Sequence, residues 1–410
     1  MIPPFLRSNR NFRRYFIGQS VSLLGDQITL IALPLTAVLV LHATAGQMGA
    51  LTTAYLIPNL LFALHAGVWI DRRGRRRQMM LATDVLRGLC IATIPLTYAF
   101  GHLTWAQLYA VAFLTGSLSV LFYVAYDAFF QVVVPREDYV QANSLIHGSR
   151  AFSSLAGTSA GGVLVQVLRG PYALALDAVS FLWSALFLGK IDAEEPPGSP
   201  PEPGALLSGV RWIRGNPTVR AELLGVATMN LFNFMYFALF ILYATRSLGV
   251  RPATLGIVLG AASIGTLLGS FVTARISRRF GVGPAFIAGC FLFPAPLILV
   301  PAAGGPHWLV LSILFVAEFT SGIGLMLLDI MGASISAGTV PTALRARVSG
   351  AFTLVNDGVR PLGTSVAGVL GATIGVRPTL WIATVGALLG LLFYIGSPIP
   401  KLHDVPEMAG

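Results

Sequence analysis

The sequence predicts an all-α membrane protein with twelve transmembrane helices in two pseudo-symmetric six-helix bundles. Of its 410 residues, 55% are hydrophobic and only 11% are charged, whereas soluble domains carry about 25% charged residues. A spanning helix needs about 20 predominantly apolar residues, and the chain has room for a dozen such segments. These segments also repeat between the two halves of the chain, which predicts two similar bundles.

The internal repeat rests on three short landmarks. They recur in the same order at an offset of 206 or 207 residues: Arg72-Arg73-Gly74 with Arg279-Phe280-Gly281, Val134-Pro135 with Val340-Pro341, and Gly157-Thr158-Ser159 with Gly363-Thr364-Ser365. A shared order at nearly one offset indicates a duplicated unit. We therefore expect bundles over 1–190 and 219–410, joined by a linker over 191–218.

The elements follow in chain order. Residues 1–14 hold four arginines and predict an amphipathic start on the membrane surface. We expect helices at 15–40, 46–70, 78–99, 104–133, 141–168 and 171–190, and then at 219–246, 253–277, 284–301, 306–337, 346–374 and 378–396. Between the two sets, residues 192–203 are polar and rich in proline, which disfavours a packed structure. Residues 206–213 predict a short amphipathic helix within the linker.

Lysine and arginine are distributed unequally between the two sides of these helices. One side holds 20 of the 27, the opposite loops hold 4, and three arginines lie inside helices. Because positive residues collect on the cytoplasmic side, we expect both termini in the cytoplasm. The same confinement to loops explains the net charge of +10 without a nucleic-acid partner.

A basic loop between the second and third helices carries the most specific pattern. Its spacing is Gly-x-x-x-Asp-Arg-x-Gly-Arg-Arg, formed by Gly67, Asp71, Arg72, Gly74, Arg75 and Arg76. Gly74 can supply a positive φ at a sharp turn, and Gly67 permits close helix packing. The pattern resembles the signature loop of the major facilitator superfamily of secondary transporters. In that role, Asp71 is expected to dock near residues 346–356 and to gate the transport cycle.

Ionisable residues inside membrane helices are expensive and are functional candidates by default. The superfamily resemblance implies that the first, fourth, seventh and tenth helices line a central cavity. The resulting candidates for proton coupling or substrate binding are Asp26, Asp127, Glu318, Asp329, Asn230 and Asn233. Asp26 and Glu318 are expected near mid-depth, and Asp177 near the external interface.

Three arginines inside helices have expected acidic partners. Asp84 and Arg87 are three residues apart on one helix, as are Asp357 and Arg360, so each pair shares a face and can neutralise itself. Arg150 is expected to face Asp127. All of these are interpreted as intramembrane ion pairs.

The fifth helix holds Gly157, Gly161 and Gly162, a spacing that permits close helix contact. It resembles the glycine motif of drug:proton antiporters, with Thr158 where that motif has proline. Ser22–Asp26, Asp84–Arg87 and Val134–Asp138 resemble the enterobactin-exporter and macrolide-efflux branch.

These resemblances imply a monomeric, proton-coupled exporter of amphiphilic small molecules in a bacterial inner membrane, working by alternating access. A proton-coupled nutrient importer is the alternative, and a non-transporting membrane receptor is a remote one. The sequence lacks a Gly-x-x-x-x-Gly-Lys-Ser/Thr loop for ATP. Its six histidines are scattered and show no catalytic or metal-binding spacing, so we expect no enzyme, no cofactor and no metal.

Overall fold

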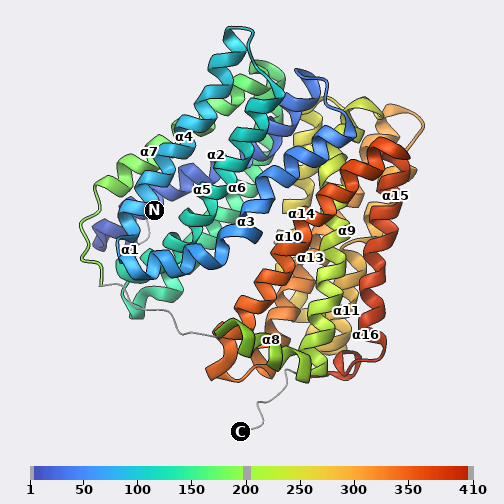
Figure 1. Ribbon diagram of the computed structural model, residues 1–410. Coiled ribbons are helices and arrows are strands. Elements are labelled where there is room, and N and C mark those ends of the chain that lie inside the picture. Colours follow the sequence, from blue (N-terminus) through green and yellow to red (C-terminus); the bar gives the residue numbers. More distant parts are fainter. Residues whose placement is uncertain (1–3, 197–204, 405–410) are drawn as a thin grey trace. The chain divides into compact units, whose positions relative to one another are not determined.

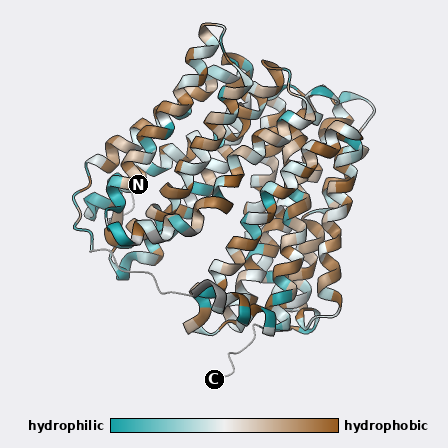
Figure 2. Ribbon diagram, viewed as in Figure 1, coloured by the Kyte–Doolittle hydropathy of each residue, from teal (hydrophilic) through white to brown (hydrophobic). Residues whose placement is uncertain are grey.

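The computed structural model describes residues 4–196 and 205–404, apart from a few side chains that include Asp71. Every regular element in these ranges is helical, which confirms the all-α prediction (Figure 1). Ten helical segments are long and apolar enough to cross a membrane. Two further helices, α3 and α14, have 29 residues each, about 43 Å at 1.5 Å per residue, and they match the remaining two predicted spans. Figure 2 shows hydrophobic residues along the helices and strongly hydrophilic ones mainly near their ends.

The helices of the first half are α1 (Pro4–Ser8), α2 (Arg10–Leu39), α3 (Ala45–Arg73), α4 (Arg76–Ala99), α5 (Trp105–Val133), α6 (Tyr139–Leu168) and α7 (Gly170–Gly189). Those of the second half are α8 (Ala205–Gly215), α9 (Pro217–Arg246), α10 (Pro252–Phe280), α11 (Val282–Leu292), α12 (Leu299–Ala302), α13 (His307–Thr339), α14 (Arg345–Thr373), α15 (Val376–Ala387) and α16 (Leu392–Ile395).

The chain forms two compact units. The first contains residues 1–43, 54–201 and 251–256, and the second contains 44–53, 202–250 and 257–410. The predicted linker boundaries at 190 and 219 stay a prediction, because residues 197–204 lie outside the described part of the chain.

In the first unit, α2 packs against α6 and α7, and α4 packs against α5 and α7. Its core includes an aromatic group in which the rings of Tyr15 and Tyr126 stack with centroids 5.2 Å apart, next to Phe12 and Phe129. Because these side chains are large and buried, they fix α2 against α5 close to one end of the bundle.

In the second unit, α9 packs against α14 and α15, and α11 packs against α13. Helix α8, which covers the predicted amphipathic segment, packs against α14. The approach is close, since a Cβ on Gly209 would lie 2.2 Å from the Arg347 carbonyl oxygen.

Two predicted helices are interrupted. The predicted span 284–301 becomes α11, the 3₁₀ segment η2 (Ala295–Ile298) and α12. Pro294 and Pro296 cause this break, since proline lacks the N–H donor that an α-helix needs. The predicted span 378–396 likewise becomes α15, the 3₁₀ segment η4 (Leu388–Leu391) and α16.

The sequence repeat has a local structural counterpart. Pro135 precedes the 3₁₀ turn η1 (Arg136–Asp138) and Pro341 precedes η3 (Thr342–Leu344). Gly74 and Gly281 both have positive φ, at 62° and 91°, a conformation that glycine adopts without steric cost. The two halves therefore turn at corresponding positions.

Candidate functional site

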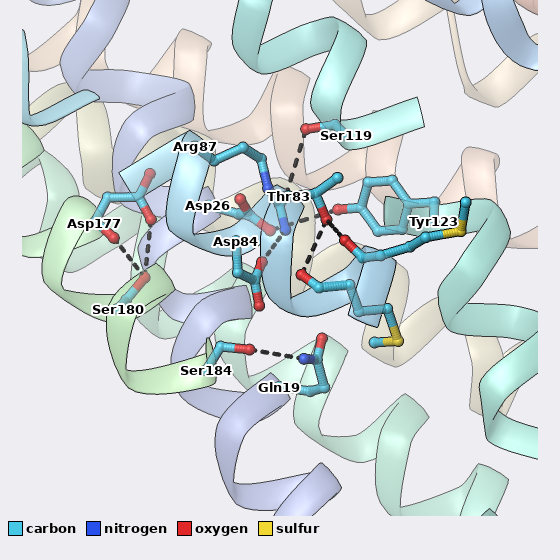
Figure 3. A network of polar contacts seen from close by, with 12 residues as sticks. Gln19, Asp26, Thr83, Asp84, Arg87, Ser119, Tyr123, Asp177, Ser180 and Ser184 are labelled. Atoms are coloured by element: carbon cyan, nitrogen blue, oxygen red, sulfur yellow. Dashed lines mark hydrogen bonds and ion pairs between the residues drawn. The ribbon is translucent and has the colours of Figure 1, made fainter. Parts of the chain in front are cut away.

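A buried ion pair lies at the centre of the first unit (Figure 3). Asp84 and Arg87 of α4 form the pair that their spacing predicted, and both side chains are almost completely buried. The Arg87 guanidinium lies 4.2 Å from the ring centroids of both Phe122 and Phe181, and it donates a hydrogen bond to Ser119 Oγ at 3.4 Å. A buried cation held in this way is compensated by a carboxylate and by two aromatic faces.

Asp177 of α7 is also buried in this region, and its expected place near the external interface stays a prediction. Thr29 Oγ1 donates to Asp177 Oδ2 at 2.5 Å, and Ser180 Oγ donates to Oδ1 at 3.0 Å. Gly25 makes room for this arrangement, because a Cβ there would lie 2.2 Å from Asp177 Oδ1. The chain thus holds a hydrogen-bonded carboxylic group against α2.

Asp26 of α2 completes the group. It is half-buried, and Tyr123 of α5 donates a hydrogen bond to its Oδ2 at 3.4 Å. Figure 3 shows carboxylates from three helices in one region: Asp26 and Asp84 lie beside Arg87, and Asp177 lies farther off, beside Ser180. We call these four residues the acid–arginine cluster. With every member ionised, it holds three negative charges and one positive charge.

A polar cavity of about 510 Å³ adjoins this cluster. Asp127 and Arg150, which the sequence predicted to face each other, both line it, together with Gln27 and Tyr123. The Arg150 guanidinium lies 5.6 Å from the Tyr126 ring centroid. Because Tyr123 lines the cavity and donates to Asp26, a single hydrogen bond links the cavity to the acid–arginine cluster.

The second unit holds a buried carboxylate on α13. Glu318 is buried, and Tyr236 of α9 donates a hydrogen bond to its Oε1 at 2.7 Å. Nearby on α9, the Asn230 amide donates to Asn356 Oδ1 of α14 at 2.8 Å, so Asn230 ties two helices together. Asn233 is half-buried on α9.

The predicted pair of the second half also forms. Arg360 and Asp357 of α14 make an ion pair at 3.0 Å, and the Arg360 guanidinium lies 5.1 Å from the Phe234 ring centroid. Unlike Asp84 and Arg87, both residues retain solvent exposure. The two pairs have the same spacing and different surroundings.

Sequence analysis missed Glu222 of α9. Its side chain is buried, accepts a hydrogen bond from Ser336 Oγ at 3.1 Å, and lines a cavity of about 350 Å³ together with Asp329 and Arg345. A usable signal was present, because Glu222 is an acidic residue one turn inside the predicted span 219–246. The structure therefore brings Asp329 together with a second carboxylate.

The basic loop is shorter than predicted, with only Gly74 and Arg75 between α3 and α4. The backbone N–H groups of Arg76 and Arg77 donate to the Glu195 carboxylate at 2.5 and 3.0 Å, which places a negative charge at the N-terminus of α4. The Arg77 guanidinium in turn donates to the Leu188 carbonyl at 2.8 Å.

Two of the loop predictions stay predictions. A Cβ on Gly67 would meet no described atom within 4 Å, so the close helix approach expected there is not seen in the described structure. The side chain of Asp71 lies outside the described part of the structure, and its docking stays a prediction. Arg72 is exposed.

The glycines of α6 do permit close packing. A Cβ on Gly157 would lie 2.6 Å from the Gln27 Cβ, and a Cβ on Gly161 would lie 3.2 Å from the Ile28 Cα, both on α2. A Cβ on Gly162 would lie 2.4 Å from the Pro252 carbonyl oxygen. These contacts leave no space for a side chain, which explains the three glycines.

Apolar spans around buried acid–arginine groups define a multi-pass membrane protein with functional groups inside its bundles. The sequence model of the Major Facilitator Superfamily matches residues 15–364 and 223–409. The chain therefore belongs to this family and is a transporter rather than an enzyme.

Individual relatives agree with this assignment. The multidrug efflux pump Tap of Mycolicibacterium fortuitum is 26% identical over 406 residues, with 93% of each chain covered. The uncharacterized MFS-type transporter YfiS of Bacillus subtilis is 25% identical, with 98% of this chain and 96% of that one covered.

Solved structures share the fold. The nucleoside transporter NupG matches with a TM-score of 0.76 at 12% identity, covering 93% of this chain and 98% of that chain. A bacterial homologue of the iron transporter ferroportin, in an inward-facing state, matches with a TM-score of 0.74 at 16% identity, covering 94% and 98%.

Proposed function

We propose that the protein exports amphiphilic small molecules from a bacterial cell in exchange for protons. It would act as a monomer in the inner membrane, with both termini in the cytoplasm and the two bundles alternating in access. Relatives named as multidrug efflux pumps support the export direction. The acid–arginine cluster supports proton coupling, and it is the observation on which the proposal rests.

The charges of the acid–arginine cluster are unequal in number and favour the uptake of protons. Within membrane-spanning helices, Asp26 and Asp84 lie beside a single cation, Arg87, and a third carboxylate, Asp177, is buried in the same region. Burying uncompensated charge in a low-dielectric interior is costly, and a carboxylate relieves this cost by binding a proton. Since Arg87 balances one carboxylate, the other two are the sites where protons would be taken up and released.

The link to substrate runs through Tyr123. Its hydroxyl donates to Asp26 and its side chain lines the cavity that holds Asp127 and Gln27. A cationic ligand in this cavity would compete with a proton for the negative charge of the cluster. That competition yields exchange, because loading of one species favours release of the other.

The test is substrate-induced proton release from purified protein, combined with dye transport into everted vesicles energised by a proton gradient. Asp26→Asn and Asp177→Asn are expected to keep downhill flux and to lose both uphill movement and proton release. The control is Glu137→Gln, which neutralises an exposed carboxylate outside the cluster and is expected to behave as wild type.

Three results would contradict the proposal. Unchanged proton release in both cluster variants would move coupling elsewhere, with Asp127, Asp329 and Glu318 next to test. Accumulation of substrate in the opposite direction would identify a proton-coupled importer. Binding without any flux would identify a receptor.

A further inference from the structure

A groove with a basic rim opens between α3, α4 and α5 in the first unit. Its volume is about 440 Å³. Arg73 and Arg75 stand at the rim, Trp69 forms one side, and Leu86, Leu118 and Leu121 form an apolar wall. We call this set the Trp69 groove. It is separate from the acid–arginine cluster and from the polar cavity that holds Asp127.

The apolar end of the groove faces the hydrocarbon. Leu86 is 47% exposed and lies on one face of α4 with Leu89 and Leu96, which are 56% and 59% exposed. Because α4 is a membrane span and its exposed leucines form one stripe, that stripe contacts lipid chains. The wall of the groove is therefore the continuation of a lipid-facing surface.

The opposite end lies at a membrane–water interface. Two arginines within three positions cannot enter the hydrocarbon, and tryptophan prefers the headgroup level. The Arg73 guanidinium is held over the Trp69 ring, 4.5 Å from its centroid. Among the described residues that line the groove, none is acidic. The rim thus presents two positive charges beside an ordered aromatic side chain.

From this arrangement we propose that the Trp69 groove binds one anionic phospholipid. The phosphate would lie between Arg73 and Arg75, since guanidinium groups match phosphate oxygens in geometry and charge. One acyl chain would pack along Leu86, Leu118 and Leu121. A zwitterionic lipid brings a positive group toward the same rim and is disfavoured, as basic interfacial pockets select anionic headgroups.

The experiment uses the full-length protein with Trp69 as its only tryptophan, the other five of its six replaced by phenylalanine. It is reconstituted with brominated phosphatidylglycerol or brominated phosphatidylcholine at equal mole fraction, and bromine quenching of Trp69 fluorescence reports occupancy. We expect a preference of about thirtyfold for the anionic lipid, from two interfacial arginines at about 1 kcal/mol each.

Matched variants assign that preference to the rim. Arg73→Ala with Arg75→Ala is expected to bring quenching by the two lipids to the same level. Arg278→Ala with Arg279→Ala removes the same charge at the corresponding turn of the second half, where Arg279 lies over Phe280 at 5.4 Å, and is expected to retain the preference. Equal loss in both double variants would attribute it to overall charge and overturn the proposal.

Two further arms keep the test decisive. In the protein that retains both rim arginines, the preference for the anionic lipid is expected to fall at high ionic strength. This measurement does not depend on whether the alanine variant folds. Equal quenching by both lipids at low salt would refute the site. Relief of quenching by millimolar inorganic phosphate or glycerol phosphate would show a site for free anions rather than for a membrane lipid.

Discussion

The stability of the acid–arginine cluster should depend unequally on its members, and Arg87→Met tests this directly. Arg87 is 1% exposed, pairs with Asp84 and lies between two aromatic rings. Its removal leaves the buried Asp84 uncompensated, for which about 3–5 kcal/mol is typical. Methionine keeps much of the volume, so a cavity contributes little to this loss. We expect unfolding in a detergent titration to be easier by that amount.

Removal of the acidic partner should lower the free energy of unfolding by less. In Asp84→Asn, the Arg87 cation still has Asp26 beside it (Figure 3), and both aromatic contacts remain. We therefore expect a loss of about 1.5–3 kcal/mol, the range for one lost hydrogen bond to a charged group. The double variant Asp84→Asn/Arg87→Met should be more stable than Arg87→Met alone, because no unpaired carboxylate remains at position 84.

The matched control is Arg360→Met, which breaks an ion pair of identical spacing in the second unit. Arg360 is 34% exposed, so water compensates the remaining Asp357 and the expected loss is about 0–1 kcal/mol. The assay is the change in tryptophan fluorescence during unfolding by sodium dodecyl sulfate. Equal losses of unfolding free energy in Arg87→Met and Arg360→Met would refute the reasoning. So would a double variant Asp84→Asn/Arg87→Met that is no more stable than Arg87→Met.

Four other predictions follow from single features. Gly25→Ala should lower the free energy of unfolding by about 1–3 kcal/mol through overpacking, whereas Gly148→Ala, where a Cβ meets nothing within 4 Å, should leave the melting temperature unchanged or raised. Asp71→Asn should slow transport without lowering expression; transport at the wild-type rate would leave the loop as a topological anchor. A reporter that folds only in the cytoplasm should be active when it is fused after Gly410. Activity of a reporter that folds only after export would instead show the opposite orientation. Glu318→Gln should weaken uphill transport less than Asp26→Asn does, as measured by dye flux at a fixed proton gradient.

Helix positions and sequence-local pairs could be predicted because their signals lie within one segment. Apolar runs of sufficient length mark the spans, and a three-residue spacing brings Asp84 to Arg87 and Asp357 to Arg360. The break in the predicted span 284–301 was not predicted, although Pro294 and Pro296 were a usable signal for it. The superfamily fold followed from these signals and from the basic loop.

The contacts of single acids across the bundle could not be predicted in the same way. Helix α7 carries one signal that was overlooked, because Asp177, Ser180 and Ser184 recur at helical spacing and mark the face that the structure buries. The partner of Asp177 across the bundle, Thr29 of α2, and the space left by Gly25 are evident only in the structure. The buried position of Glu222 was missed because a residue near a helix start usually lies at the membrane interface. Its hydrogen bond with Ser336 of α13 becomes evident only in the structure.

The hydrogen bonds of Glu195 affect the segment that connects α7 to α8. Its carboxylate is fastened to the start of α4, and at the other end α8 is seated on α14. Covalent geometry limits the distance from Pro196 to Ala205 to about 32 Å, whatever the conformation between them. Loss of the Glu195 hydrogen bonds would release Glu195 from α4, so this carboxylate helps to set the largest distance between α7 and α8 that the chain permits.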